Sequence, residues 1–505
     1  MKKFYFTLVT FLFLAVANAQ IVNIPDANFK AKLLSASISN QVASTQTPFY
    51  DSFGNFIVDT YNKIDQNNDG QIQVSEASTI KYLKLNNSGI SNLDGISSFT
   101  NLEFLECNQN QLTSLNISSL ISLKRLVCAN NSLNNLNASD LINLEFLNCD
   151  SNQLTSLELN GLTSLQSLRC RINLLTSLNV SGLTNLQVLY CDTNQLTSLN
   201  INGLTSLIEV YCYNNELPSL NLSELTSLLV LNCAVNQLPS LNLSGLNNLI
   251  SLDCSNNQLP ILNFTGLSTL EYLRCNSNQL PSLNVSNLTN LKDLSCFDNQ
   301  IPVLNLSGLT SLNSLDCSYN QLLSINLDDQ YVLKYLSCQN NQFTSLNLNN
   351  LSSLHYLRCF SNQLTSLYMK NNNPANWSYL EYSFNPNLQL ICADEEDIIL
   401  VEQKNFAYGY VNCVVNSNCN LSVETSLYDD NYFTIYPNPV DEVLNLTSKQ
   451  DTQICSLTIY NLLGQQVQTT TNPTNTVDVS SLKTGNYIVK VFTDKGVSSS
   501  KFLKE

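Results

Sequence analysis

The sequence has few of the residues on which catalysis and charge-driven binding usually depend. It contains one histidine, His355, in 505 residues, and 23 lysines and arginines against 39 aspartates and glutamates. A lone histidine argues against a Ser-His-Asp or Cys-His catalytic site. The net charge of −16 disfavours nucleic acid or an anionic membrane surface as the main partner. We therefore expect a binding role before an enzymatic one.

Long apolar runs are also missing, except at the N-terminus. Residues 1–3 are basic, residues 4–16 form a short apolar run, and residues 17–19 read as a small-x-small cleavage site. This run is too short for a membrane helix and ends in a cleavage signal, so residues 1–19 are predicted to be a signal peptide. No other stretch approaches a membrane span, and we expect the mature protein to be exported.

The sequence does have one cysteine every 21 residues. Thirteen of the 17 cysteines keep this spacing without a slip: Cys107, Cys128, Cys149, Cys170, Cys191, Cys212, Cys233, Cys254, Cys275, Cys296, Cys317, Cys338 and Cys359. Asparagine follows each of them by three residues, from Asn110 to Asn362, and leucines complete the pattern LxxLxCxxNxLxxL. A fixed period of this length indicates a solenoid of stacked repeats.

This pattern resembles the leucine-rich repeat, with cysteine in the position usually held by leucine, over residues 80–390. The resemblance implies short parallel strands on a concave face. The convex side should be extended or 3₁₀, because the repeat has no room for a return helix. The first repeat is atypical, with Leu85 in the cysteine position and Ser88 in the asparagine position, and it is similar to repeats of internalin-type bacterial surface proteins. Terminal repeats of this kind cap a solenoid.

The repeated cysteines should point into the core, because side chains alternate along a strand and the leucine two residues earlier shares their side. Neighbouring strands lie about 4.8 Å apart, but the Cβ vectors of stacked cysteines run parallel, so we predict reduced, structural thiols. The asparagines should satisfy backbone groups of the turns. Cys392, Cys413 and Cys419 lie outside the series; one pair of them is a candidate disulfide, and the sequence does not say which.

Residues 20–79 should form a small helical N-terminal cap, with a short helix over residues 24–34 that has Pro25 in its first turn. Residues 65–76, DQNNDGQIQVSE, fit D-x-[DN]-x-[DN]-G-x₅-E and resemble an EF-hand calcium loop. The resemblance implies a structural calcium ion with these ligands: Asp65, Asn67, Asp69, the Gln71 carbonyl and Glu76. The alternative is a polar turn that matches the pattern by chance.

Ligand-binding residues are expected three before, one before and one after each cysteine, because these positions alternate with the buried leucine and cysteine. All five arginines of the chain fall there. The candidate ligand-binding residues are Arg169, Arg171, Tyr190, Tyr211, Tyr213, Arg274, Phe297, Tyr356 and Arg358. Arginine and tyrosine are enriched at binding hot spots. The alternative is that solvent-facing sheet positions favour aromatics and need charges for solubility.

The period is lost after Cys359. The residues expected to cover the open end of the core are Trp377, Tyr379, Leu380, Tyr382 and Phe384. Residues 391–424 should form a C-terminal cap and linker, and residues 425–505 a small antiparallel β-sandwich. The stretches FTIYPNPV, IYNLLGQQV, VDVSSLKTGNYIVKV and KFLKE resemble the C-terminal sorting domain of the type IX secretion system of Bacteroidetes. The resemblance implies export by that machinery, followed by attachment to the outer-membrane surface or release.

These features together predict a secreted or cell-surface leucine-rich-repeat protein that binds an extracellular protein on its concave face and catalyses nothing. A glycan ligand is the alternative, favoured by the grouped tyrosines. A glycan-degrading enzyme is a more distant alternative, because paired acids in a regular sheet are more simply explained as solubilising charges.

Overall fold

The computed structural model describes residues 20–50, 56–373, 376–419, 433–448, 454–461, 466–471, 475–493 and 496–505. The predicted signal peptide, residues 1–19, and residues 420–432, which include part of the predicted linker, lie outside the described residues. The chain divides into two compact units, Met1–Ser417 and Asn418–Glu505.

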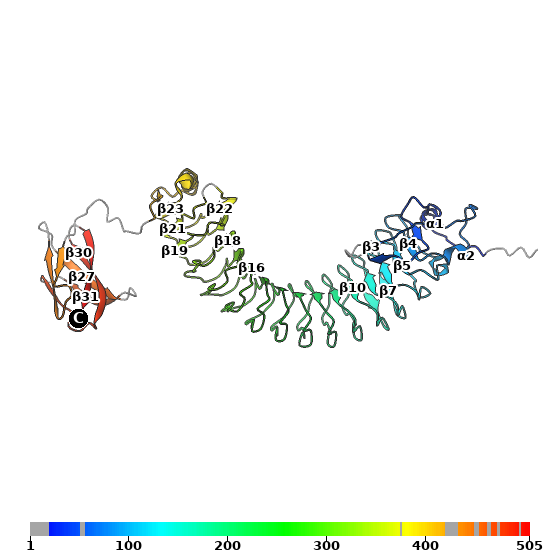
Figure 1. Cartoon of the computed structure of the whole chain (residues 1–505), viewed down its shortest axis with the longest axis horizontal. Helices are drawn as coiled ribbons and strands as arrows, with labels where there is room; N and C mark the ends of the chain where they lie inside the picture. The colour runs from blue at the N-terminus through cyan, green and yellow to red at the C-terminus, as the bar shows by residue number, and fades with distance from the viewer. Residues whose placement is uncertain are drawn as a thin grey trace, which may run out of the picture. The chain divides into compact units, whose positions relative to one another are not determined.

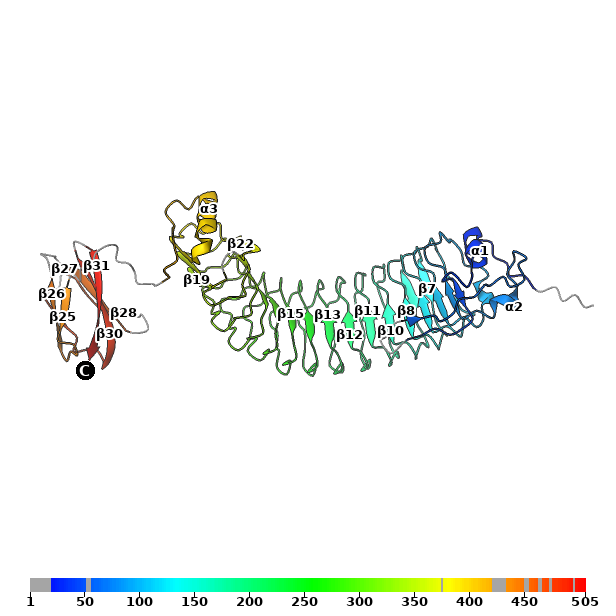
Figure 2. The same cartoon turned by 45° about the horizontal axis from the view of Figure 1, so that its top comes forward.

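The first unit is built around one sheet of sixteen short strands (Figures 1 and 2). β1 (Ala43–Ser44) lies antiparallel at one edge. Fifteen parallel strands follow: β4 (Tyr82–Lys84), β5 (Phe104–Glu106), β6 (Arg125–Val127), β8 (Phe146–Asn148), β10 (Ser167–Arg169), β11 (Val188–Tyr190), β12 (Glu209–Tyr211), β13 (Val230–Asn232), β14 (Ser251–Asp253), β15 (Tyr272–Arg274), β16 (Asp293–Ser295), β17 (Ser314–Asp316), β18 (Tyr335–Ser337), β20 (Tyr356–Arg358) and β22 (Tyr379–Glu381). The repeat array curves, and these strands lie along its inner side (Figure 1). This confirms the predicted solenoid.

The segments that return from one strand to the next are extended, as predicted. Between Cys107 and Asn373 the structure contains no helix, and pieces of two further parallel sheets form on the return side. One consists of β7 (Asn135–Asn137) and β9 (Ser156–Glu158); the other of β19 (Ser345–Asn347), β21 (Ser366–Met369), β23 (Leu390–Ala393) and β24 (Val414–Asn416). A 3₁₀ turn, η1 (Ile96–Ser98), occurs in the first repeat.

The thirteen repeated cysteines lie in the core with no exposed surface, and all are free thiols. Adjacent strands pair at an offset of one repeat, so Leu168 lies beside Leu189 and the cysteines that follow stack in the same order. Burial raises the pKa of these thiols, to about 12 for Cys128 and Cys275. Because the thiolate is the reactive form, the cysteines act as inert packing groups. The prediction of reduced, structural cysteines is confirmed.

Buried asparagines tie each repeat to its neighbour. In one example, Asn215 donates through Nδ2 to the carbonyls of Cys191, one repeat earlier, and Cys212, at 3.2 and 3.1 Å. Its Oδ1 accepts from the Leu196 backbone N–H at 3.0 Å. The same arrangement recurs from Asn110 to Asn385, and we call it the asparagine ladder. It satisfies turn groups that the stacking would otherwise bury unpaired.

The repeat pattern continues beyond Cys359, where the regular 21-residue spacing ends. Tyr382, 23 residues after Cys359, is fully buried in the cysteine position, and Asn385 takes the asparagine position, donating to the Cys359 and Tyr382 carbonyls. β22 therefore is a strand of the main sheet and pairs with β20. A two-residue insertion hides the period in the sequence. Of the residues expected to cover the open end of the core, Trp377 packs against it, whereas Phe384 is 75% exposed, so the prediction was wrong for Phe384.

Both ends of the array are capped. α1 (Ala27–Leu34) begins after Asp26, whose carboxylate accepts from Phe29 N–H and from the backbone N–H groups of Ser91 and Asn92 in the first repeat. Pro25 thus precedes the cap residue and is not in the first turn, contrary to the prediction. The other cap elements are β2 (Phe49–Tyr50), β3 (Phe56–Ile57), α2 (Val74–Ala77), η2 (Glu395–Asp397) and α3 (Ile398–Tyr408).

The three candidate cysteines for a disulfide, Cys392, Cys413 and Cys419, differ in their bonding. Cys392 and Cys419 are disulfide-bonded, whereas Cys413 is a free thiol. Cys392 lies in β23, next to β24 in the sheet.

The second unit consists of two antiparallel sheets around one small core, which confirms the predicted β-sandwich. One sheet contains β25 (Phe433–Tyr436), β26 (Val443–Ser448) and β29 (Thr476–Asp478); the other contains β27 (Ile454–Asn461), β28 (Gln466–Thr471), β30 (Gly485–Thr493) and β31 (Gly496–Lys504). Both sheets contribute buried residues, among them Leu444, Leu457, Val489 and Phe502.

Removing one member of the asparagine ladder should destabilise the array strongly. Asn236 donates to the Cys212, Cys233 and Ala234 carbonyls, each at 3.1 Å, and accepts from Leu217 N–H at 3.0 Å. Each buried group left unpaired costs about 1–3 kcal/mol, so Asn236→Ala should lower the free energy of unfolding by at least about 3 kcal/mol in urea titrations followed by circular dichroism.

Asn242 supplies the matched control. It lies in the same repeat but is exposed, with one bond from Ser244 N–H, so Asn242→Ala should cost about 1 kcal/mol or less. Equal losses for the two variants would contradict the role given to the ladder.

Candidate functional site

The concave face carries the positions three before, one before and one after each cysteine. On β11, for example, Val188 and Tyr190 are partly exposed and flank the fully buried Leu189. All nine predicted ligand-binding residues occupy this face and are partly or fully exposed. They are not evenly spread: two groups of close side-chain contacts form, one over β6–β12 and one over β18–β22.

The first group alternates arginines with aromatic rings from one strand to the next. The Arg125 guanidinium carbon lies 3.7 Å from the centroid of the Phe146 ring. Arg169 lies between two rings, 5.6 Å from the Phe146 centroid and 5.0 Å from that of Tyr190. A cation that lies over the face of an aromatic ring is attracted electrostatically by that ring. The contacts hold otherwise flexible arginines in fixed positions.

Tyr190 and Tyr211 continue this row. Their ring centroids are 4.6 Å apart at an interplanar angle of 65°, and the Tyr190 hydroxyl donates to Glu209 Oε2. Burial and this bond to Glu209 raise the pKa of Tyr190 to about 12, so the hydroxyl stays neutral. The two rings present an amphipathic surface with one end apolar and one end polar.

A row of three charged residues and one tyrosine runs beside them, in the position after the cysteine of four successive repeats: Asp150, Arg171, Asp192 and Tyr213. Arg171 Nε and Nη2 donate to Asp150 Oδ2 at 3.2 and 3.1 Å, and its backbone N–H donates to Oδ1 at 2.8 Å. Asp192 is only 1% exposed and one of its carboxylate oxygens has no hydrogen-bond partner. Burial raises the pKa of Asp192 to about 6.

The second group is a column of tyrosines. Tyr335, Tyr356 and Tyr379 occupy the same position on β18, β20 and β22. Their centroids are 5.9 and 5.0 Å apart, and the second pair is nearly parallel, at 20°. Arg358, also on β20, places its guanidinium carbon 5.3 Å from the Phe360 centroid.

Two predicted residues lie between the groups. Arg274 is exposed on β15 and, with Tyr211 and Tyr272, lines a cavity of about 270 Å³ that spans β12–β15. Phe297 is partly exposed one repeat further along and belongs to neither group. The structure thus brings together seven of the nine predicted residues, in two places.

Sequence reasoning missed three aromatic residues of the face. Phe146 occupies the position three before Cys149, so the repeat pattern could have found it. Tyr379 was obscured by the insertion before β22. Phe56 comes from the N-terminal cap and packs 5.5 Å from Phe104, between centroids; no periodicity points to it, because it lies outside the repeats.

The EF-hand-like loop, residues 65–76, has the tight turn that its sequence predicts. Asp65 accepts from the backbone N–H groups of Asp69 and Gly70, both at 3.2 Å, and Gly70 has a φ of 76°. The Glu76 carboxylate accepts from Gln66 and Gln73 N–H at 2.7 and 3.0 Å, so it closes the loop. In the described part of the chain no three His, Cys, Asp or Glu side chains converge on a possible metal position. The loop's amide and carbonyl oxygens would have to complete the ligand set, and calcium stays a prediction.

Comparisons with known proteins agree with this architecture. Residues 434–505 match the family described as the secretion system C-terminal sorting domain. The functional domain of InlJ from Listeria monocytogenes, which includes a cysteine ladder, is 21% identical, with 96% of this chain and 98% of that chain covered and a TM-score of 0.55. A leucine-rich-repeat protein from Leptospira interrogans is 25% identical, with 68% and 97% covered and a TM-score of 0.57. No match was found among curated proteins.

These similarities identify the fold of the first unit as a leucine-rich-repeat solenoid like that of the internalins, and the tail as a secretion sorting domain. Within the described residues, no helix is long and apolar enough to cross a membrane.

The buried Asp192 predicts an unusual pH dependence. Its pKa of about 6 exceeds the ordinary value near 3.8, so the folded protein binds the proton more tightly than the unfolded chain. The contribution of Asp192 to stability therefore falls as the pH rises from about 4 to about 6. Asp192→Asn should raise the free energy of unfolding by about 1–2 kcal/mol at neutral pH, and the gain should vanish near pH 4.

Chemical denaturation at several pH values measures this difference. Asp140→Asn, on an exposed turn, is the matched control and should change little at any pH. An Asp192→Asn variant that is less stable than the wild type at neutral pH would show that Arg171 and Tyr213 hold the charged carboxylate after all.

Proposed function

We propose that this protein is a non-catalytic binding protein that holds an extracellular protein ligand on the concave face of its solenoid. The observation that carries the proposal is that all five arginines, at least partly exposed, stand on this one face among aromatic rings. Arginine and aromatic side chains dominate the binding energy of protein interfaces. The solenoid does not need them there, because its stability comes from the buried leucines, cysteines and asparagines.

The arrangement also favours tight binding because it is ordered before the ligand arrives. The ladder fixes the distance between neighbouring strands, and ring contacts fix Arg125 and Arg169. Side chains that are already immobile lose less conformational entropy on binding. A ligand that spans several strands would meet a preformed pattern of charges and rings.

The sorting domain supports an extracellular site of action. A chain exported by this route would act on the outer-membrane surface or after release, and the type IX machinery would be the partner of the second unit. The solenoid would then meet proteins of other cells or of the surroundings.

A glycan is the second candidate ligand, favoured by the tyrosine column. Tyr335 and Tyr379 are 45% and 43% exposed, and the nearly parallel rings of Tyr356 and Tyr379 offer flat apolar faces on which a sugar could stack. This surface lies apart from the arginine group, so the two candidates can be tested separately.

Arrays of extracellular proteins and of glycans, probed with the labelled full chain, test the proposal. Arg169→Ala combined with Tyr211→Ala should weaken binding to a protein ligand by at least about 2 kcal/mol, since it removes two hot-spot side chains. Tyr331→Ala, on an exposed turn outside the sheet, is the control and should leave binding unchanged.

Binding to glycans alone, lost in Tyr356→Ala, would instead favour the second candidate. Unchanged affinity of the Arg169→Ala, Tyr211→Ala variant for every protein ligand would rule out the first group as the site.

We propose further that calcium binds the loop of residues 65–76 and stiffens the N-terminal cap. Asp65, Asn67, Asp69, the Gln71 carbonyl and Glu76 would hold the ion, and Gly70 already has the left-handed conformation that the tight turn needs. The Ile72 side chain after this turn is buried, and its carbonyl accepts from Val22 N–H, so order in the loop would pass directly to the cap.

Millimolar calcium should therefore raise the melting temperature of the wild type by several degrees, because a ligand that binds only the folded state stabilises it. Glu76→Gln should abolish the increase, while Glu402→Gln, on exposed α3 surface, should keep it. The same melting curve with calcium and with a chelator would contradict the proposal.

A further inference from the structure

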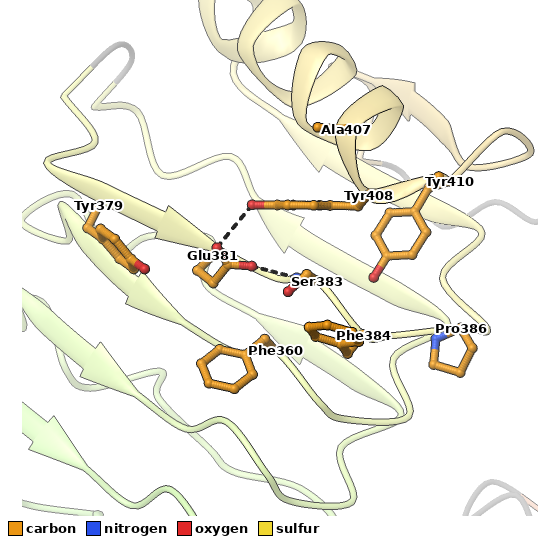
Figure 3. A pocket seen from close by; sticks show the side chains of 10 residues that line it. Phe360, Tyr379, Glu381, Ser383, Phe384, Pro386, Ala407, Tyr408 and Tyr410 are labelled. Carbon is orange, nitrogen blue, oxygen red and sulfur yellow. Dashed lines mark hydrogen bonds between the residues drawn. The ribbon is translucent and has the colours of Figure 1, made fainter.

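The tyrosine column ends in a cavity with a volume of about 1050 Å³, which Figure 3 shows from close by. β22 and the segment after it form one wall, with Tyr379, Glu381 and Phe384. The C-terminal end of α3 forms the opposite wall, with Tyr408 and Tyr410. Phe360, from the preceding repeat, closes the cavity toward the array. Half of the ten lining residues are therefore aromatic.

Glu381 is the one charged residue among the side chains that line this cavity. Its carboxylate accepts from the Tyr408 hydroxyl at 3.2 Å and from Ser383 N–H at 3.1 Å (Figure 3). None of the ion pairs among the described residues includes Glu381. The Tyr408 hydroxyl in turn accepts from Lys404 Nζ at 3.4 Å, so Lys404 is linked to the carboxylate through this hydroxyl and forms no salt bridge with it.

The aromatic walls are fixed by their own contacts. The Tyr410 hydroxyl accepts from Asn385 N–H at 2.8 Å and donates to the Tyr382 carbonyl at 3.1 Å. The Tyr408 ring meets the buried Tyr382 ring edge-on, at 5.2 Å between centroids. A ligand would therefore enter a preformed space and would not have to order these rings.

Phe384 adds an exposed ring to the rim of the cavity. It lies two residues after the cysteine position, where the backbone is left-handed in each repeat; its φ is 54°. Asparagine, which tolerates this conformation, takes the position in five other repeats: Asn87, Asn130, Asn214, Asn256 and Asn340. Phe384 is strained there and is 75% exposed at the rim of the cavity. Ile172, Val235 and Tyr319 share this conformation and are also exposed, so what distinguishes Phe384 is its place at the rim of the cavity, where its ring is open to a ligand.

The chemistry of the cavity is that of a receptor for a cation. Elsewhere on this face the chain places its own arginines over aromatic rings, and here Arg358 lies over Phe360 and Lys404 over Tyr408. Inside the cavity, ring faces and a carboxylate combine without a cation of the chain among the lining residues. Aromatic faces and a carboxylate together select positive charge.

We infer that this cavity binds the basic side chain of an arginine or lysine residue that the protein ligand presents. The inference rests on the proposed function, since it takes the ligand of the concave face to be a protein. The net charge of −16 would draw a basic ligand toward the molecule. A neutral sugar could stack on the rings but would leave the charge of Glu381 uncompensated, so the cavity favours a basic group.

The full chain can be titrated with N-acetyl-arginine amide, with the lysine analogue, and with N-acetyl-citrulline amide, which has the shape of arginine without its charge. Saturation-transfer NMR reports binding. At least one basic probe should bind at least about tenfold more tightly than citrulline, which corresponds to about 1.4 kcal/mol. Maltose serves as the neutral sugar probe. Equal binding of the basic probes and citrulline, preferential binding of maltose, or no binding of either basic probe would each overturn the inference.

Two variants assign the binding to this cavity. Glu381→Gln should lower the affinity for the basic probe at least about tenfold. Phe384→Asn should do the same while melting at the same or a higher temperature than the wild type, because asparagine suits the left-handed backbone. Wild-type affinity in both variants would place the probe elsewhere and refute the assignment.

The result is separable from the proposed function. If a protein ligand found on the arrays is lost with Arg169→Ala and Tyr211→Ala but binds Glu381→Gln normally, the concave-face proposal stands and the cavity inference fails. If the basic probe binds in the cavity but no protein ligand is found, the inference about the cavity's chemistry stands and the proposed function fails.

Discussion

The solenoid depends on the side-chain amide of one buried asparagine in each repeat. The strands of the main parallel sheet are three residues long, and strands this short leave most of the repeat in turns whose polar groups are buried by stacking. Each asparagine donates to carbonyls of its own repeat and of the one before, and accepts an N–H from the preceding turn, as Asn215 does. Without these bonds the stacked turns would contain unpaired buried groups, which a fold tolerates poorly.

The position of the functional surface follows from this constraint. Because the asparagine ladder holds neighbouring repeats in the same register, side chains in equivalent positions form columns across the strands. Tyr335, Tyr356 and Tyr379 form one such column, and Arg169 fits between rings from two neighbouring strands. A few substitutions in exposed positions are enough to build a patterned surface, and the buried positions need not change. The cavity at the end of the array adds a site of different chemistry, where a cap element closes over the last strand.

Within the repeat array, the sequence could predict the features that the 21-residue period determines. Strand positions, the free buried cysteines and the concave location of the arginines all follow from a 21-residue repeat, and the structure has them so. The period did not reveal strand β22, because Tyr382 replaces cysteine after a two-residue insertion. The cavity could not be foreseen, since it arises where Tyr408, at the end of α3, meets Glu381, at the end of β22, a tertiary contact between segments of different kinds. The pattern could also have predicted the pairing of Arg125 with Phe146, because each lies three residues before a repeated cysteine.

The central claim is that the cysteine position serves packing alone and leaves function to its exposed neighbours. Alkylation of the unfolded, unreduced protein, followed by mass spectrometry of its peptides, tests this claim most directly. The account predicts that all thirteen repeated cysteines carry the alkyl group, while Cys392 and Cys419 become reactive only after reduction. Disulfides or other modifications within the series would contradict it, because the cysteines would then be linked or reactive groups and not the inert core described above.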